Sequence, residues 1–306
     1  MEKVLVTGGA GFIGRHLVHA LRGRHQDVAV VDDGRCGTPA LLPPNVEQHN
    51  CDISQLSVAE WKELLYGVTT VYHLAAAKLH TPSSTADELF RTNVIATQRL
   101  AEAAAALGRV RVIFASSLYA YGKLGPSRMS DGSVPEPNTL YGATKLTGES
   151  IFRSYGFTQD LQWLGARLFF AFGSGQFADG GYPSVIVKNF ERIQRDEEPV
   201  VLGSGLQSLD YIHVTDVVAA LITLADSGLT GRIVNVCTGV PTTVIDLVKA
   251  MVDVSGCQLN IAFQPPDWTE GTTRVGEPST ALQALGWKPV VSLETGLREV
   301  WVEDFS

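Results

Sequence analysis

The stretch TGGAGFIG, residues 7–14, constrains the fold more than any other part of the chain. It follows a short β-branched run at residues 4–7 and leads into residues 12–21, whose apolar side chains recur at helical spacing. Glycines spaced G-x-x-G-x-x-G between a strand and a helix let the backbone approach a pyrophosphate, whose charge the helix N-terminus stabilises. The stretch therefore predicts a dinucleotide-binding strand–turn–helix unit.

Apolar runs that alternate with helical segments continue along the first half of the chain. The runs lie at residues 28–31, 70–76, 110–115 and 161–168, and the helical segments include residues 88–107 and 141–155. Alternation of this kind produces a parallel sheet with helices on both faces. We therefore expect an α/β fold with a Rossmann-type, doubly wound parallel sheet.

The alternation weakens after Arg167. The stretch FFAFGSGQFADGGYP is rich in glycine and aromatic residues and predicts a loop, strand and helix character returns at 209–224, and 232–236 predicts one more strand. The last 70 or so residues are typical of a smaller α+β lobe. We expect a dinucleotide-binding domain of residues 1–168 plus 208–238, and a substrate-binding lobe of residues 169–207 plus 239–306.

Charge and composition exclude several classes of function. The net charge of −8, without basic patches, argues against nucleic acid as a partner. The four cysteines lack the spacing of a metal site or a disulfide framework, and no window reaches the roughly 18 apolar residues of a membrane span. We expect a cytoplasmic protein with no membrane partner. Residues 175–306 hold 17 acidic and 8 basic side chains, which fits either a solvated surface or an acidic substrate half.

An acidic residue at the end of the second predicted strand bears on the choice of cofactor. Asp32 comes 18 residues after Gly14, where a carboxylate accepts the adenosine ribose hydroxyls. Its charge disfavours a 2′-phosphate and therefore favours NAD over NADP. Arg35 could hold that phosphate instead, so NADP stays open.

The stretch LYGATK places Tyr141 and Lys145 one helical turn apart. By itself the pair fits an ordinary amphipathic surface contact as well as it fits proton transfer. Taken with the glycine turn and Asp32, however, it makes the chain resemble the extended short-chain dehydrogenase/reductases, the NAD-dependent epimerase/dehydratase group. The other matching stretches cover nearly the whole chain: CDI at 51–53, HLAA at 73–76, Asn93 in RTNVIAT, SSLYAYG at 116–122, DYIHVTDV at 210–217 and LGWKP at 285–289.

The resemblance implies a set of cofactor-binding residues. Asp52 and Ile53 would flank the adenine, Lys78 would reach the phosphates, and the residues from Leu168 to Phe170 would lie near the nicotinamide. Several of these positions also have a purely structural interpretation, such as core packing for Leu74 and Ala75 and a backbone bridge for Asn93. The full set is Gly8, Gly11, Phe12, Ile13, Asp32, Asp33, Arg35, Asp52, Ile53, Leu74, Ala75, Ala76, Lys78, Asn93, Ser116, Tyr141, Lys145, Leu168 and Phe170.

The resemblance also implies the catalytic residues Ser117, Tyr141 and Lys145. Tyr141 would be the general acid/base, because positive charge beside a phenol stabilises its phenolate, and Lys145 supplies that charge. Ser117 would hydrogen-bond the reacting oxygen. The expected substrate contacts are Ser117, Leu118, Tyr119, Asp179 and Arg274, and no metal is expected.

Departures from the family pattern narrow the expected reaction. Leu118 and Tyr119 stand where the dehydratases of the family have an Asp-Glu pair, which argues against a 4,6-dehydratase. Phe170, Leu209 and Gln264 replace the residues that hold a nucleotide-sugar diphosphate, with Arg274 as a candidate substitute. These losses, together with the acidic second half, suggest a neutral or cationic polyol, such as an amino sugar or aminocyclitol from a biosynthetic pathway, held by carboxylates such as those of Asp179, Asp210 and Asp267.

The resulting expectation is an NAD(P)-dependent oxidoreductase, a ketoreductase or dehydrogenase, acting on a carbonyl or carbinol carbon of a sugar-like substrate. A nucleotide-sugar 4-epimerase with a transient keto intermediate is the alternative enzyme, because it uses the same three residues. A dinucleotide-sensing regulator without turnover is the alternative outside enzymes. The family usually forms dimers through two helices per subunit, so the resemblance also implies a homodimer through residues 88–107 and 141–155.

Overall fold

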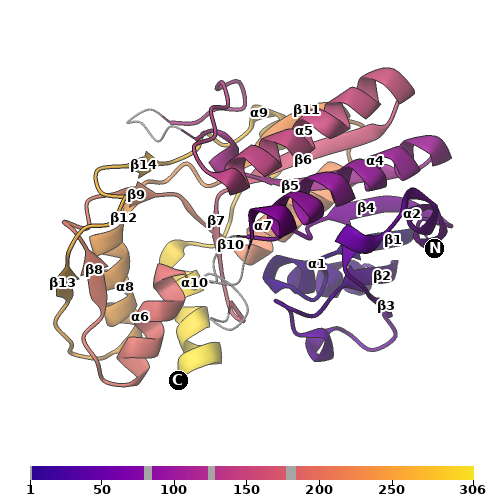
Figure 1. Cartoon of the computed structure of the whole chain (residues 1–306). Coiled ribbons are helices and arrows are strands. Elements are labelled where there is room, and N and C mark those ends of the chain that lie inside the picture. Colours follow the sequence, from indigo (N-terminus) through magenta and orange to yellow (C-terminus); the bar gives the residue numbers. More distant parts are fainter. Residues whose placement is uncertain (1, 79–84, 123–127, 177–183) are drawn as a thin grey trace.

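Seven parallel strands form the central sheet of the computed structural model, which describes residues 2–78, 85–122, 128–176 and 184–306 (Figure 1). The strand order is β11-β6-β5-β4-β1-β2-β3. The strands are β1 (Lys3–Thr7), β2 (Asp27–Asp32), β3 (Glu47–Asn50), β4 (Val68–His73), β5 (Arg111–Ser117), β6 (Gln162–Leu168) and β11 (Arg232–Val236). The expected α/β, Rossmann-type fold is confirmed.

Helices cover both faces of this sheet. Successive side chains of a strand point to opposite faces, so Val4 and Val6 pack with α1 (Phe12–Gly23) and α7 (Val214–Asp226), whereas Leu5 packs with the helices of the other face. That second group contains α2 (Val58–Leu64), α4 (Ala96–Leu107) and α5 (Leu140–Gln159). All the strands run parallel, so their carboxyl ends lie along one edge of the sheet, where side chains can gather.

A second lobe with its own apolar core lies beside the carboxyl ends of the strands (Figure 1). Its elements are β7 (Phe170–Phe172), α6 (Val185–Gln194), β8 (Val200–Leu202), β9 (Ser208–Leu209), β10 (Tyr211–His213), β12 (Thr242–Thr243), α8 (Val244–Ser255), β13 (Ala262–Gln264), β14 (Thr273–Arg274) and α10 (Leu293–Val300). Near its end the chain returns to the first core, where Leu282 of α9 (Thr280–Ala284) and Trp287 pack with residues of α7.

Three local features differ from the sequence expectations. The strand β3 was missed because its residues, EQHN, are polar and lie at the sheet edge. The stretch after Arg167 is not all loop, because Phe170–Phe172 pairs with Tyr211–His213 in a two-stranded sheet. The predicted helix 88–107 consists of α3 (Ala86–Phe90), one π-helical turn at Arg91–Ile95 and α4.

Candidate active site

The glycine turn between β1 and α1 is packed too closely for side chains. Gly8 has a φ of 70°, and a Cβ there would come within 2.8 Å of the backbone nitrogen of Ala75. A Cβ on Gly14 would overlap the carbonyl oxygen of Gly8. The N-terminus of α1 has no side-chain cap and no acidic residue in its first turn. These backbone amides therefore fit the pyrophosphate of a dinucleotide.

Asp32, at the end of β2, holds this turn in place. Its carboxylate accepts hydrogen bonds from the backbone nitrogens of Ala10, at 2.9 Å, and Gly34, at 2.9 Å. Carboxylate oxygens have lone pairs beyond those two bonds, so the half-buried group keeps acceptors for ribose hydroxyls. The glycine turn and the predicted ribose-binding carboxylate therefore form one unit.

Arg35, the residue that left NADP open, is surrounded by carboxylates. Its guanidinium donates to Asp33 at 2.6 Å and to Glu88 at 2.6 Å, and lies 3.4 Å from Asp52. The hydrogen bond with Asp33 is the main cause that raises the pKa of Arg35. A 2′-phosphate here would approach three carboxylates whose charges exceed that of the single guanidinium, which favours NAD.

The segment after β4 is fixed by two buried side chains. His73 lies between the hydroxyls of Thr7 at 2.8 Å and Thr97 at 3.0 Å. Burial, with a smaller contribution from the charge of Lys145, lowers the pKa of His73 to about 3. Asn93 hydrogen-bonds both backbone groups of Ala77, and its amide also donates to the Thr144 hydroxyl at 3.0 Å.

These two side chains act on structure rather than on chemistry. His73 is a neutral residue that connects β1, β4 and α4. Asn93 uses its amide to connect the segment after β4 to α5, which is the backbone bridge that was considered beside cofactor binding.

Tyr141, Lys145 and Ser117 come together where β5 ends and α5 begins. Thr139 caps α5 by accepting a hydrogen bond from the nitrogen of Gly142, which fixes the first turn that carries the tyrosine. The Lys145 ammonium donates to the Ala115 carbonyl at 2.8 Å and lies 5.7 Å from the centre of the Tyr141 ring. The Ser117 side chain hydrogen-bonds Tyr141.

The charges around this group define its resting state. Burial and then the charge of Lys78 lower the pKa of Lys145 to about 7, while Glu149 acts in the opposite direction. Burial and then Tyr119 raise the pKa of Tyr141, which the Ser117 hydrogen bond opposes. At neutral pH the phenol is therefore protonated. The Lys78 side-chain nitrogen lies 6.0 Å from the centre of the Tyr141 ring, so two lysine side chains are placed to stabilise a phenolate at Tyr141.

A buried ion pair that the sequence analysis did not predict connects α5 to β6. Glu149, one turn after Lys145, accepts two hydrogen bonds from Arg167, at 2.8 and 2.7 Å, and a third from Ser116 at 2.6 Å. Ser116, expected at the cofactor, therefore uses its hydroxyl on the protein interior. The available signal was Arg167 itself, a cation inside the otherwise apolar strand QWLGARL.

The predicted substrate residues are placed differently from one another. Leu118 is 2% exposed and packs in a buried cluster with Phe169, so its side chain belongs to the core and not to a substrate surface. Tyr119 packs edge-on against both Tyr141 and Phe170. Arg274 lies 5.0 Å from the centre of the Phe170 ring. Asp179 lies outside the described residues.

The remaining predicted residues lie at or near the carboxyl ends of the parallel strands. Phe12 and Ile13 are half-buried in the first turn of α1, and Ile53 is buried beside Asp52. Ala75 donates its backbone nitrogen to the Thr7 hydroxyl at 3.2 Å. The half-buried residues Gly11, Leu74, Ala76 and Phe170 and the buried Leu168 complete the set.

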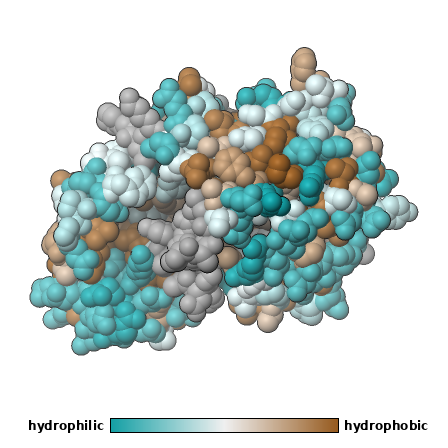
Figure 2. All heavy atoms as spheres, viewed as in Figure 1, coloured by the Kyte–Doolittle hydropathy of each residue, from teal (hydrophilic) through white to brown (hydrophobic). Residues whose placement is uncertain are grey.

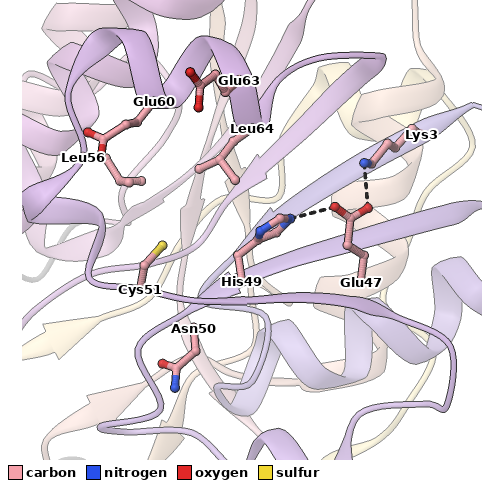
Figure 3. Close-up of a pocket in the computed structure, with 9 residues that line it drawn as sticks. All are labelled: Lys3, Glu47, His49, Asn50, Cys51, Leu56, Glu60, Glu63 and Leu64. Atoms are coloured by element: carbon pink, nitrogen blue, oxygen red, sulfur yellow. Dashed lines mark hydrogen bonds and ion pairs between the residues drawn. The ribbon is translucent and has the colours of Figure 1, made fainter.

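A surface hollow elsewhere has none of this chemistry. Figure 3 shows it beside β3, with His49 and Lys3 both bound to Glu47, and Glu60 and Glu63 on the opposite wall. Across residues 2–78, 85–122, 128–176 and 184–306, no group of three or more metal-binding side chains was found. Within those same ranges, none of the helices combines the length and apolarity needed to cross a membrane.

Comparison with known proteins agrees with this geometry. Residues 4–237 match the NAD dependent epimerase/dehydratase family. A putative UDP-glucose 4-epimerase of Methanocaldococcus jannaschii is 28% identical over 98% of both chains. An uncharacterized UDP-glucose epimerase, YtcB of Bacillus subtilis, is 30% identical over 96% of this chain and 95% of its own.

Solved structures show the same similarity. The UDP-N-acetylglucosamine 4-epimerase from Methanobrevibacter ruminantium, in complex with UDP-N-acetylmuramic acid, superposes with a TM-score of 0.90 at 27% identity, covering 98% of this chain and 96% of the other. MoeE5, in complex with UDP-glucuronic acid and NAD, gives a TM-score of 0.85 at 32% identity over 97% of each chain. The resemblance expected from the sequence motifs is confirmed.

Proposed function

This chain belongs to the NAD dependent epimerase/dehydratase family, and we propose that it is a nucleotide-sugar epimerase that oxidises and then reduces one carbinol carbon. Its membership makes it an NAD-dependent, sugar-modifying enzyme. The observation that carries the proposal is the group at the start of α5, where Tyr141 hydrogen-bonds Ser117 and its ring centre lies 5.7 Å from the ammonium of Lys145. A regulator without turnover would have no need of these three side chains in contact.

The three side chains divide the proton chemistry among them. NAD, when bound, accepts and returns the hydride. Tyr141 first loses its own proton to solvent; as the phenolate it then takes the proton of the sugar hydroxyl during oxidation and donates it back during reduction. Lys145 and Lys78 stabilise the phenolate before the first step and after the second. Ser117 hydrogen-bonds the reacting oxygen and keeps it within reach of the phenol.

Epimerisation is favoured over two related reactions. Two of the proteins named above carry 4-epimerase names. The first expectation from the sequence, a net reduction or oxidation by a ketoreductase or dehydrogenase, would consume or leave one equivalent of reduced cofactor, whereas epimerisation leaves none. Water elimination needs an additional acid and base beside the sugar. Leu118 and Tyr119 offer no carboxylate at the positions where the dehydratases have them.

The amino-sugar or aminocyclitol substrate is not supported. The named relatives carry nucleotide-sugar names. The Asp210 carboxylate, expected to hold a cation, is buried and accepts hydrogen bonds from the nitrogens of Thr238 and Gly239 at 2.9 and 2.8 Å. Asp267 accepts one from the nitrogen of Thr269 at 2.8 Å. We therefore propose a nucleotide-linked sugar, bound by residues 169–207 plus 239–306, with NAD on residues 1–168 plus 208–238.

An assay that follows both sugar and cofactor tests the reaction. The purified protein is incubated with NAD and, separately, with UDP-glucose, UDP-N-acetylglucosamine, UDP-glucuronic acid and free amino sugars, and the products are separated by chromatography. We expect a C4 epimer of at least one UDP-sugar without net change in nicotinamide absorbance. Stoichiometric NADH would identify a dehydrogenase, and turnover of free amino sugars alone would refute the nucleotide-linked substrate.

We also propose a homodimer in the cytoplasm. The helices α4 and α5 pack side by side, and apolar side chains gather over them on the face shown in Figure 2. Ile95, just before α4, is 42% exposed, and the small residues Ala143 and Ser150 of α5 allow a partner helix to approach closely.

A further inference from the structure

A buried arginine of the second lobe has no counter-ion among the residues that the structure describes. Arg274 is 4% exposed, and its Nε has no hydrogen-bond partner. Burying a guanidinium without an anion costs free energy, so such a group is normally paired. The Arg274 guanidinium therefore lacks an anionic partner among the described residues.

Two carboxylates of the same part of the chain, Asp210 and Glu270, form hydrogen bonds with other groups. Asp210, beside Arg274 in the backbone pairing, accepts hydrogen bonds from the backbone nitrogens of Thr238, Gly239 and Gly276. Glu270 binds the Ser204 hydroxyl at 2.6 Å. No described residue forms an ion pair with the Arg274 guanidinium, so its missing partner comes from outside this part of the chain.

Aromatic rings hold the guanidinium in place and connect it to the catalytic group. It lies 5.0 Å from the ring centre of Phe170 and 5.6 Å from that of Trp268. Phe170 contacts Tyr119, which contacts Tyr141. The Trp268 side chain is 61% exposed, so one of the two rings against the guanidinium reaches the protein surface. A guanidinium held in place by these two rings fits an anionic group of the molecule that reacts at Tyr141.

A second unpartnered polar group lies beside the cation. The hydroxyl of Tyr211 is buried without a hydrogen-bond partner. Burial raises the pKa of Tyr211, and the charge of Arg274 acts in the opposite direction, which places the two groups close together. A phenol hydroxyl and a guanidinium both donate hydrogen bonds, and an oxyanion accepts from both.

We propose that Arg274 binds an oxyanion of the substrate, either a carboxylate on the sugar or a phosphate of the nucleotide linkage. This inference rests on the proposed function, because it assumes that the sugar reacts at Tyr141. It makes Arg274 a specificity-determining residue and excludes a cationic group of the substrate at this position.

Calorimetric titration of the NAD-bound protein tests the inference without turnover. The probes are UDP-glucuronic acid, UDP-glucose, UDP and free glucuronic acid, and the variants are Arg274→Met, Arg274→Gln and, as control, Arg298→Met, which removes an exposed arginine of the same lobe. Loss of a charge-assisted pair raises Kd on the order of 10- to 100-fold. If the partner is a phosphate, Arg274→Met weakens all three UDP probes. If it is a sugar carboxylate, only UDP-glucuronic acid, and free glucuronic acid where it binds, weaken.

The outcomes separate this inference from the proposed reaction. Changes in Kd of less than about twofold for every anionic probe, with Arg298→Met equal to Arg274→Met, would overturn the role of Arg274 and leave the epimerase untouched. Binding that depends on Arg274 without turnover of any UDP-sugar would overturn the epimerase alone. If Arg274→Met fails to fold, Arg274→Gln, which keeps a polar side chain without the charge, decides by the same criteria.

Discussion

The ammonium of Lys145 lies 5.7 Å from the centre of the Tyr141 ring, one turn further along α5, and is held there by the carbonyl of Ala115. The hydrogen bond to β5 fixes the lysine, so the ammonium cannot move away from the phenol without losing a buried partner. Proton transfer at Tyr141 and the packing of α5 on the sheet therefore depend on the same contact.

Replacing Tyr141 by Phe should abolish proton transfer and leave the dinucleotide site intact. General acid–base catalysis contributes about 10²- to 10⁴-fold, so we expect kcat to fall by that order while the Kd for NAD stays within about twofold. Tyr155→Phe, which removes a phenol from the same helix, is the control and should keep kcat. Equal loss of NAD affinity and turnover in Tyr141→Phe would indicate a folding role instead.

The glycine turn offers a matched pair of substitutions on α1. Gly14→Ala places a methyl group against the carbonyl of Gly8, so the turn must shift, and we expect NAD affinity to fall at least about tenfold. Gly23→Ala meets no atom within 4 Å and removes a helix glycine, so it should raise the free energy of unfolding by about 0.5–1 kcal/mol. Fluorescence titration with NADH and thermal melts measure the two effects. Normal NAD affinity in Gly14→Ala would contradict the pyrophosphate site.

Local periodicity predicted the parts of the molecule that depend on neighbours in sequence. The four-residue spacing of Tyr141 and Lys145 and the strand–turn–helix around Gly8 needed no tertiary information. The strand β3 could not be predicted from the sequence, because its polar residues adopt a strand conformation only through pairing with β2. The ion pair of Glu149 and Arg167 joins a helix to a strand, and no residue spacing in the sequence predicts such a contact.

The position of Arg274 shows the same limit of sequence-based prediction in the second lobe. The sequence could name it as a replacement for missing arginines, but its burial against Phe170 and Trp268 depends on how β14 pairs with β9. The sequence also assigned Asp210 to a cationic substrate, because an acidic side chain gives no sign that backbone amides of another loop will satisfy it.

Acid should destabilise the protein through His73. Its pKa in the folded protein, about 3, lies below the ordinary 6.5, so between these values the unfolded chain binds a proton that the folded protein does not. Stability present above pH 6.5 is therefore lost as the pH falls towards 3, on the order of 3 kcal/mol between about pH 7 and pH 4. Urea titrations of wild type and His73→Gln across this range measure the difference. Parallel pH profiles for the two proteins would contradict the neutral buried imidazole.

Charges placed on the outer face of α4 and α5 should separate the proposed dimer. Ile95, just before α4, and Ser150 of α5 are both exposed. If the two helices form the interface, Ile95→Glu combined with Ser150→Glu brings four like charges into a self-complementary contact, where a desolvated carboxylate has no partner. We expect analytical ultracentrifugation to show a dimer for wild type and a monomer for the double variant, with unchanged NAD binding. Val290→Glu, at an exposed apolar residue outside these helices, is the control and should remain dimeric. A double variant that sediments like wild type would place the interface elsewhere.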